Sequence, residues 1–142
     1  MANAHAVRRV DVALPVVWAA VADHLAIATW GPGVSVTMER LGEDDPNGVG
    51  AIRDINMPGP GPHIREEITA FEPGRLLAYR ALSGTPFKDW RGEVEVAEHN
   101  GGTAIKWSLS CRSPLPGTDL ILRAAALAMA SAVARSARQR SA

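Results

Sequence analysis

The chain has 142 residues and a formal net charge of zero, because 15 basic residues balance 15 acidic ones. This length is typical of one domain with its own core, so we expect a single domain over residues 1–142, ordered from about residue 5 to 138. Balanced charge, and the lack of a basic stripe with interleaved aromatic residues, argue against a nucleic-acid partner.

The single cysteine, Cys111, excludes an internal disulfide and any multi-cysteine metal site. It fits the reducing cytoplasm, where we expect the protein to be located. The first ten residues have no apolar core of signal-peptide length, and the longest apolar run, 124–130, is too short to cross a bilayer. We therefore expect no stable membrane insertion.

Near the start of the chain, the pattern predicts one strand followed by two short helices. Apolar and polar residues alternate over residues 4–12, as in a half-buried strand. Pro15 suits the first turn of a helix, where its missing N–H costs nothing. A second short helix is expected from about Asp23 to Thr29, and the segment Trp30-Gly-Pro-Gly33 ends it.

In the middle of the chain, the alternation of apolar and polar residues predicts six further strands separated by turns. These strands lie at about residues 34–39, 49–57, 64–70, 77–81, 90–96 and 103–111. The segment from Met57 to His63 contains three prolines and cannot hold a β-ladder, so it is expected to be a stiff loop. Asn100-Gly-Gly102 predicts a hairpin turn between the last two strands.

The segment from about Asp119 to Gln139 is the clearest predicted helix. Helical spacing predicts one broad apolar face made of Ile121, Leu122, Ala125, Ala128, Met129, Ala132 and Val133. Seven of the eleven residues from Ala124 to Ala134 are alanine, which favours the helix but fills little volume. A helix of this kind laid across a concave sheet is expected to leave space unfilled.

Six short motifs follow one another along the chain: Pro15–Trp18, Asp23, Trp30–Gly33, Gly48–Arg53, Glu66–Ile68 and Gly102–Trp107. In this order they resemble the START-related superfamily of polyketide cyclases and dehydrases, lipid-transfer domains, the birch pollen allergen and plant hormone receptors. The likeness is greatest to small bacterial single-domain members and covers roughly residues 5–138.

The resemblance implies an α+β helix-grip fold. In that fold a curved antiparallel sheet of six or seven strands wraps around a long C-terminal helix, and two short helices follow the first strand. By the same resemblance, the loops at 57–63 and 83–87 would flank a cavity mouth, although ordinary hairpin turns explain them equally well. The fold alone does not choose between carrier, receptor and enzyme.

Two charged residues, Arg53 and Glu66, fall on strand faces that alternation assigns to the interior. The loop at 57–63 joins their strands, so the strands should pair antiparallel with position 53 near position 66 or 67. A lone buried charge would cost several kcal/mol, and we therefore expect the two residues to pair. The pair is either a structural salt bridge or a polar anchor for a ligand, and a catalytic Glu66 is a third interpretation.

Aromatic residues recur on the predicted inward faces. Each one alone fits ordinary core packing, but together they fit a binding cavity, which is mostly apolar with a few placed polar groups. The predicted ligand-binding residues are Trp30, Arg53, Ile55, Met57, Glu66, Ile68, Tyr79, Trp90, Trp107, Ala125 and Met129. The four histidines are scattered and predict no metal site.

We therefore expect the protein to bind or carry a small hydrophobic molecule, such as a lipid, a polyketide or an isoprenoid-like compound. The alternative is a cyclase or dehydratase without metal or other cofactor, in which Glu66, Arg53 and Tyr79 are the candidate catalytic residues. A second alternative is a protein-interaction or quinone-chaperone-like module. Assembly into a homodimer is left open.

Overall fold

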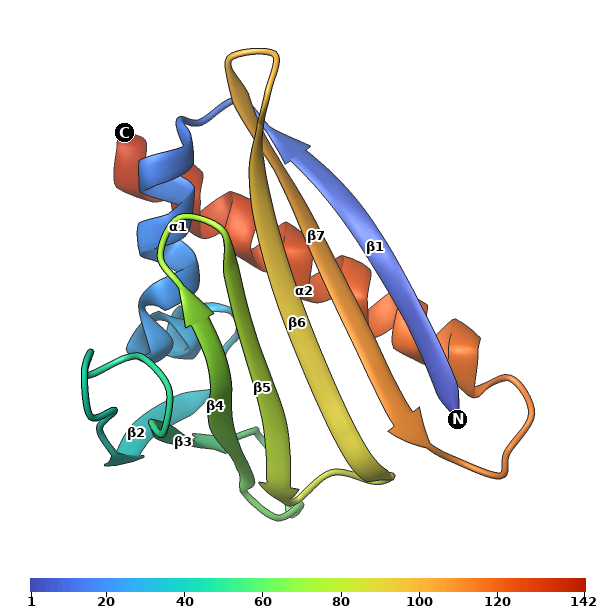
Figure 1. The fold of residues 1–142 in the computed structure, drawn as a ribbon. Coiled ribbons are helices and arrows are strands. Elements are labelled where there is room, and N and C mark those ends of the chain that lie inside the picture. Colours follow the sequence, from blue (N-terminus) through green and yellow to red (C-terminus); the bar gives the residue numbers. More distant parts are fainter.

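In the computed structural model, which describes residues 1–142, a seven-stranded antiparallel sheet curves around one long helix. The strands are β1 (Ala2–Val10), β2 (Ser35–Arg40), β3 (Ile52–Asn56), β4 (Ile64–Glu72), β5 (Leu76–Ser83), β6 (Lys88–His99) and β7 (Gly102–Arg112). The helices are α1 (Leu14–Ala22), the short 3-10 helix η1 (His24–Thr29) and α2 (Thr118–Ser141). The predicted helix-grip fold is confirmed, with α2 lying across one face of the sheet (Figure 1).

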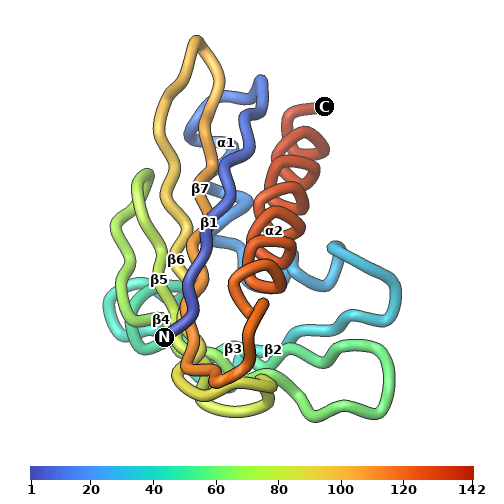
Figure 2. The backbone as a smooth tube through the Cα atoms, turned by 90° about the vertical axis from the view of Figure 1, so that its right-hand side faces the viewer, coloured from blue at the N-terminus to red at the C-terminus, as the bar shows by residue number.

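The strand order is β1-β7-β6-β5-β4-β3-β2, so the first strand pairs with the last one. Strands β2 to β7 form a continuous meander. The two short helices α1 and η1 carry the chain from the β1 edge of the sheet to the β2 edge. Figure 2 shows β2 and β3 curling beneath α2, which gives the sheet its concave inner face.

Helix α2 packs on the sheet through its smallest residues. Its buried face is formed by Leu122, Ala126, Ala130, Val133 and Ala137, at spacings of three or four residues. The prediction that Ile121 belongs to the apolar face turned toward the sheet is wrong, because Ile121 is 57% exposed. The helix is apolar around most of its circumference, so periodicity does not define one face, and the alanine side allows the closest approach to the strands.

The strand predicted from residue 49 begins only at Ile52. Gly50 has a φ of 91°, so the chain turns there instead of extending, and Val49 lies 53% exposed. At the other end, β3 stops at Asn56, and Met57 begins the proline-rich loop. The ordered elements run from Ala2 to Ser141, slightly beyond the expected limits.

By length and composition α2 passes a simple test for a membrane-spanning helix, with a mean hydropathy of 1.4 over its most apolar 18-residue window. In the structure 44% of that window is buried inside the protein. The core helix of a globular domain passes the same test, so the result is weak evidence for a membrane span.

Candidate ligand cavity

A cavity of about 510 Å³ lies between the inner face of the sheet, η1 and α2. Ten of its 14 lining residues are hydrophobic. The lining is formed by Ile27, Trp30, Arg53, Ile55, Met57, Ile64, Glu66, Tyr79, Trp107, Ala128, Met129, Ser131, Ala132 and Arg135. The α2 side contributes mostly small residues, and this leaves the space that the alanine-rich sequence led us to expect.

Three aromatic rings form one wall of the cavity. The ring of Trp30 meets that of Trp107 edge to face, with centroids 6.1 Å apart. Trp107 meets Tyr79 in the same way at 6.2 Å. Edge-to-face contacts fix ring orientations, so this wall is pre-formed.

Eight of the eleven residues predicted to bind a ligand line this cavity: Trp30, Arg53, Ile55, Met57, Glu66, Tyr79, Trp107 and Met129. The structure places the other three elsewhere. Ile68 is 1% exposed within the core, and Trp90 stacks on Phe87 with centroids 6.5 Å apart. Ala125 is half-buried one turn before the part of α2 that faces the cavity.

The expected pairing of Arg53 with Glu66 is confirmed. The two residues are direct partners in the β3–β4 ladder. Nε of Arg53 donates to Oε1 of Glu66 at 2.8 Å, and Nη2 lies 2.8 Å from the same oxygen. Their side chains are only 5% and 7% exposed, so the pair is screened little by solvent.

His24 belongs to this polar cluster and was missed by the sequence reasoning, which treated it as a scattered histidine. Nη1 of Arg53 donates to Nδ1 of His24 at 3.1 Å, while Nε2 lies 2.8 Å from the carbonyl oxygen of Asn47. These contacts require a neutral ring with its proton on Nε2. Burial, with the nearby charge of Arg53, lowers the pKa of His24 to about 4. No sequence motif marks His24, because only the packing of η1 against β2, the neighbour of β3, brings it to Arg53.

Tyr79 lies beneath the cluster. The guanidinium carbon of Arg53 is 4.7 Å from the centre of its ring. Its hydroxyl accepts a hydrogen bond from Nε1 of Trp107 at 3.2 Å and lies 3.8 Å from Sδ of Met129. Burial, and then the negative charge of Glu66, raise the pKa of Tyr79, so the hydroxyl keeps its proton at physiological pH.

Gly92 makes room for Tyr79. A Cβ atom at position 92 would lie 2.1 Å from Cζ of Tyr79, closer than any real contact allows. The ring therefore crosses β6 over a residue without a side chain. Because Gly92 has no side chain, the ring of Tyr79 can lie close to the backbone of β6, and the cavity above the ring is correspondingly deeper.

One oxygen of the cluster is open toward the cavity. Both contacts from Arg53 reach Oε1 of Glu66, and no protein group donates a hydrogen bond to Oε2. Because no buried side-chain polar atom lacks a partner, Oε2 must keep accessible surface, and Glu66 lines the cavity. The arrangement can therefore hold the polar part of an otherwise apolar molecule.

The loop that begins at Met57 borders the cavity, since Met57 and Ile64 at its two ends belong to the lining. His63 in this loop pairs with Asp54 at 2.6 Å. None of residues 83–87 lines the cavity, but Gly84 lies against the backbone of His63 and Ile64. The gating role inferred by resemblance stays a prediction for both loops.

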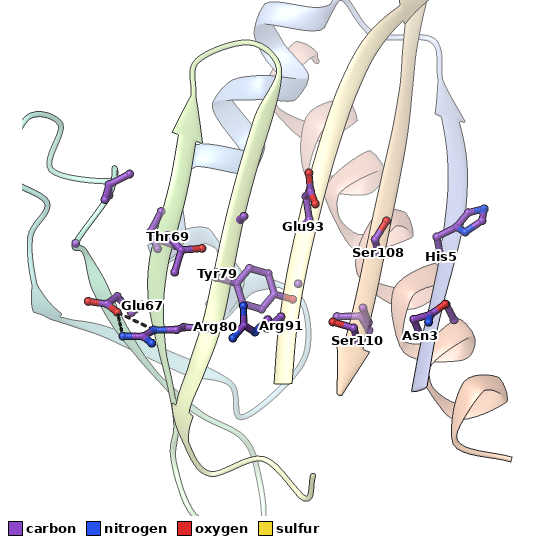
Figure 3. Close-up of a pocket in the computed structure, with 17 residues that line it drawn as sticks. Asn3, His5, Glu67, Thr69, Tyr79, Arg80, Arg91, Glu93, Ser108 and Ser110 are labelled. Carbon is purple, nitrogen blue, oxygen red and sulfur yellow. Dashed lines mark hydrogen bonds and ion pairs between the residues drawn. The ribbon is translucent and has the colours of Figure 1, made fainter. Parts of the chain in front are cut away.

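The outer face of the sheet carries a second depression, of about 730 Å³, with a different character. Figure 3 shows polar side chains along it, including Thr69, Glu93 and Ser108, and the ion pair between Glu67 and Arg80. Of the predicted site residues only Ile68 and Tyr79 border it. No group of three or more His, Cys, Asp or Glu residues that could hold a metal ion occurs in the chain.

A family model described as polyketide cyclase/dehydrase and lipid transport matches residues 1–141. No curated protein sequence matches the chain.

Solved structures show the same fold at low sequence identity. A START superfamily protein from Mycobacterium smegmatis has a TM-score of 0.78 at 12% identity, covering 96% of this chain and 97% of its own. Ara h 8.0201 has a TM-score of 0.74 at 15% identity, with the same two coverages of 96% and 97%. The Aha1 dimer from Colwellia psychrerythraea has a TM-score of 0.68 at 11% identity, covering 92% of each chain.

Proposed function

Because this chain belongs to the polyketide cyclase/dehydrase and lipid-transport family, we propose that it binds a small hydrophobic molecule in the cavity between the sheet and α2. A lipid, a polyketide or an isoprenoid-like compound fits this description. The observation that carries the proposal is an apolar cavity of about 510 Å³ that contains a buried polar cluster at its wall. Ligand sites have this composition, with apolar walls for affinity and a few polar groups for orientation.

Native mass spectrometry of the freshly purified protein tests the proposal. A co-purifying apolar molecule that is released on denaturation would support it and would name the ligand class. The variant Ala132→Phe tests the location, because Ala132 is 5% exposed and lines the cavity. Its added ring should fill the space and abolish the bound mass.

Ala124→Phe is the matched control for this variant. Ala124 lies on the same helix but is exposed and does not line the cavity. We expect this variant to keep the bound molecule. Loss of the molecule in both variants, or in neither, would contradict binding in this cavity.

A cyclase or dehydratase activity in the same cavity is the second candidate, and the open oxygen of Glu66 favours it. Oε2 is a carboxylate oxygen free to take a proton from a bound molecule, and Arg53 beside it is placed to stabilise an enolate-like oxygen. His24 has both ring nitrogens engaged, and Tyr79 holds its proton too tightly to act as a base.

Glu66→Gln separates the enzyme from the carrier. An enzyme should lose turnover by orders of magnitude while still binding its substrate, whereas a carrier should keep its apolar ligand with modestly changed affinity. If Glu66→Gln turns over a polyketone substrate at the wild-type rate, Glu66 is not a catalytic residue.

The outer surface of α2 favours an interaction with a second protein chain, including a homodimer. Leu120, Ile121 and Leu127 are 72%, 57% and 45% exposed, so this helix presents several large apolar side chains to solvent. Sedimentation velocity of the wild type and of Ile121→Glu tests this. A dimer that becomes a monomer in Ile121→Glu supports the interface, while a dimer that persists, or a monomeric wild type, contradicts it.

A further inference from the structure

The polar end of the cavity is built in a way that restricts what it can bind. Arg53 and Glu66 are 4% and 6% exposed, and both line the cavity. Two N–H groups of Arg53 donate to protein acceptors, Nε to Oε1 of Glu66 and Nη1 to Nδ1 of His24, and Nη2 lies 2.8 Å from the same Oε1. A guanidinium has five N–H groups, so donors remain beside the open acceptor Oε2.

The cluster is electrically neutral as it stands. The positive charge of Arg53 is balanced by Glu66 at 2.8 Å, and the hydrogen bonds of His24 hold that ring in its neutral form. The other charged residue of the lining, Arg135, is exposed at the edge of the cavity and donates to the carbonyl oxygen of Trp30 at 3.3 Å. Its charge is screened by solvent and adds little inside.

This balance disfavours an anionic ligand. A carboxylate at the cluster would lie against the carboxylate of Glu66 and would compete with it for Arg53. Like charges held close in a poorly solvated site repel strongly, and the repulsion between the two carboxylates selects against an anionic ligand. A hydroxyl group matches the cluster instead, because it can donate to Oε2 of Glu66 and accept from a free N–H of Arg53.

We propose that the cavity selects neutral apolar molecules that carry a hydroxyl group, such as phenols and alcohols, over carboxylic acids of the same shape. This selection rests on the proposed function and names the class of ligand for that same site. Glu66 is the specificity-determining residue, and Arg53 is its partner in holding the hydroxyl.

Three molecules with one ring system test the proposal: 2-methylnaphthalene, 2-naphthol and 2-naphthoate. Each is titrated into the full chain by isothermal calorimetry near neutral pH, where the phenol is neutral and the acid is charged. We expect 2-naphthol to bind at least about tenfold more tightly than 2-naphthoate, with 2-methylnaphthalene between them. Equal or tighter binding of 2-naphthoate would overturn the selection while leaving the proposed function standing. If none of the three binds, the proposed function itself fails.

The variant Glu66→Gln sharpens the test. It removes the negative charge and leaves Arg53 unbalanced, so the order of affinities should reverse and 2-naphthoate should bind more tightly than 2-naphthol. Glu67→Gln is the matched control, because Glu67 is the next residue of β4 and pairs with Arg40 and Arg80 on the outer face. It should keep the wild-type order. An unchanged order in a folded Glu66→Gln variant would overturn the role of Glu66, and if that variant does not fold, the wild-type comparison decides.

Discussion

Two consecutive glutamates on β4 lie on opposite faces of the same sheet. The side chain of Glu66 points inward and pairs with Arg53, and the two are 7% and 5% exposed. Glu67 points outward and pairs with Arg40 and Arg80, which are 56% and 53% exposed. The ionic chemistry is the same, but its surroundings differ, and the energy of an ion pair depends mainly on its surroundings. We therefore expect the inner pair to matter for the stability of the protein and for the specificity of the cavity. The outer pairs are solvated, and we expect them to contribute little to either.

Removing Arg53 should produce the largest effect. Arg53→Met leaves a buried carboxylate without its partner, which costs about 3–5 kcal/mol of unfolding free energy. Urea unfolding followed by circular dichroism measures this cost. The double variant Arg53→Met with Glu66→Leu should recover most of the loss, because no charge is then left buried. A loss below about 1 kcal/mol in the single variant would show that the inner pair behaves like a surface pair.

Acidification should lower the free energy of unfolding, because the buried ring of His24 must then take up a proton. Its pKa falls from 6.5 to about 4 on folding, so the unfolded chain binds the proton more tightly. The stabilisation by the neutral ring is complete above pH 6.5 and is lost as the pH falls toward about 4, with a total of about 3 kcal/mol.

His24→Gln isolates this contribution, since an amide cannot titrate in this range. The free energy of unfolding of the wild type should fall by about 3 kcal/mol more than that of His24→Gln over the same pH interval. The exposed histidine of β6, His99, provides the control, and His99→Gln should follow the wild-type curve. Parallel curves for wild type and His24→Gln would contradict the buried, neutral state of the ring.

Gly92 connects the two faces, because it borders the outer depression while the ring of Tyr79 covers its inner side. Gly92→Ala places a methyl group where that ring lies and should cost about 1–3 kcal/mol, as overpacking generally does. Thermal unfolding measures the change. Gly61→Ala is the control, since nothing lies within 4 Å of the added atom, and it should stay within about 0.5 kcal/mol of the wild type. Equal effects in both variants would mean that Tyr79 moves aside freely.

The outer face should give the smallest change. Arg80→Met removes one of two arginines from Glu67 and leaves Arg40 in place at 2.8 Å. We expect a loss below about 1 kcal/mol, shrinking further at high salt. A loss comparable to that of Arg53→Met would erase the distinction between the two faces.

The sequence predicted the β-sheet well because strand alternation reports local burial. Alternation placed Arg53 and Glu66 inward, and the connecting loop set their register to within one residue. The buried face of α2 was harder to predict, because an alanine-rich helix is apolar on several sides and only packing decides which side is covered. His24 could not be found at all, since its contact with Arg53 depends on the packing of η1 against the edge strand β2, next to β3.

The three predicted residues outside the cavity lining have a related explanation. Ile68, Trp90 and Ala125 lie on or near inward-facing positions, as the pattern predicted, but the cavity occupies only part of the inner face. Alternation distinguishes inside from outside, and it does not say where along a strand the interior is filled.

Two-dimensional ¹H–¹⁵N NMR of the full chain with added 2-naphthol tests the central claim most directly. The chain has four tryptophans, and two of them, Trp30 and Trp107, line the inner cavity. We expect their indole N–H signals to shift on titration, while the backbone signals of Glu93 and Ser108 on the outer face stay in place. Shifts confined to the outer face, with the two indole signals unmoved, would contradict ligand binding between the sheet and α2.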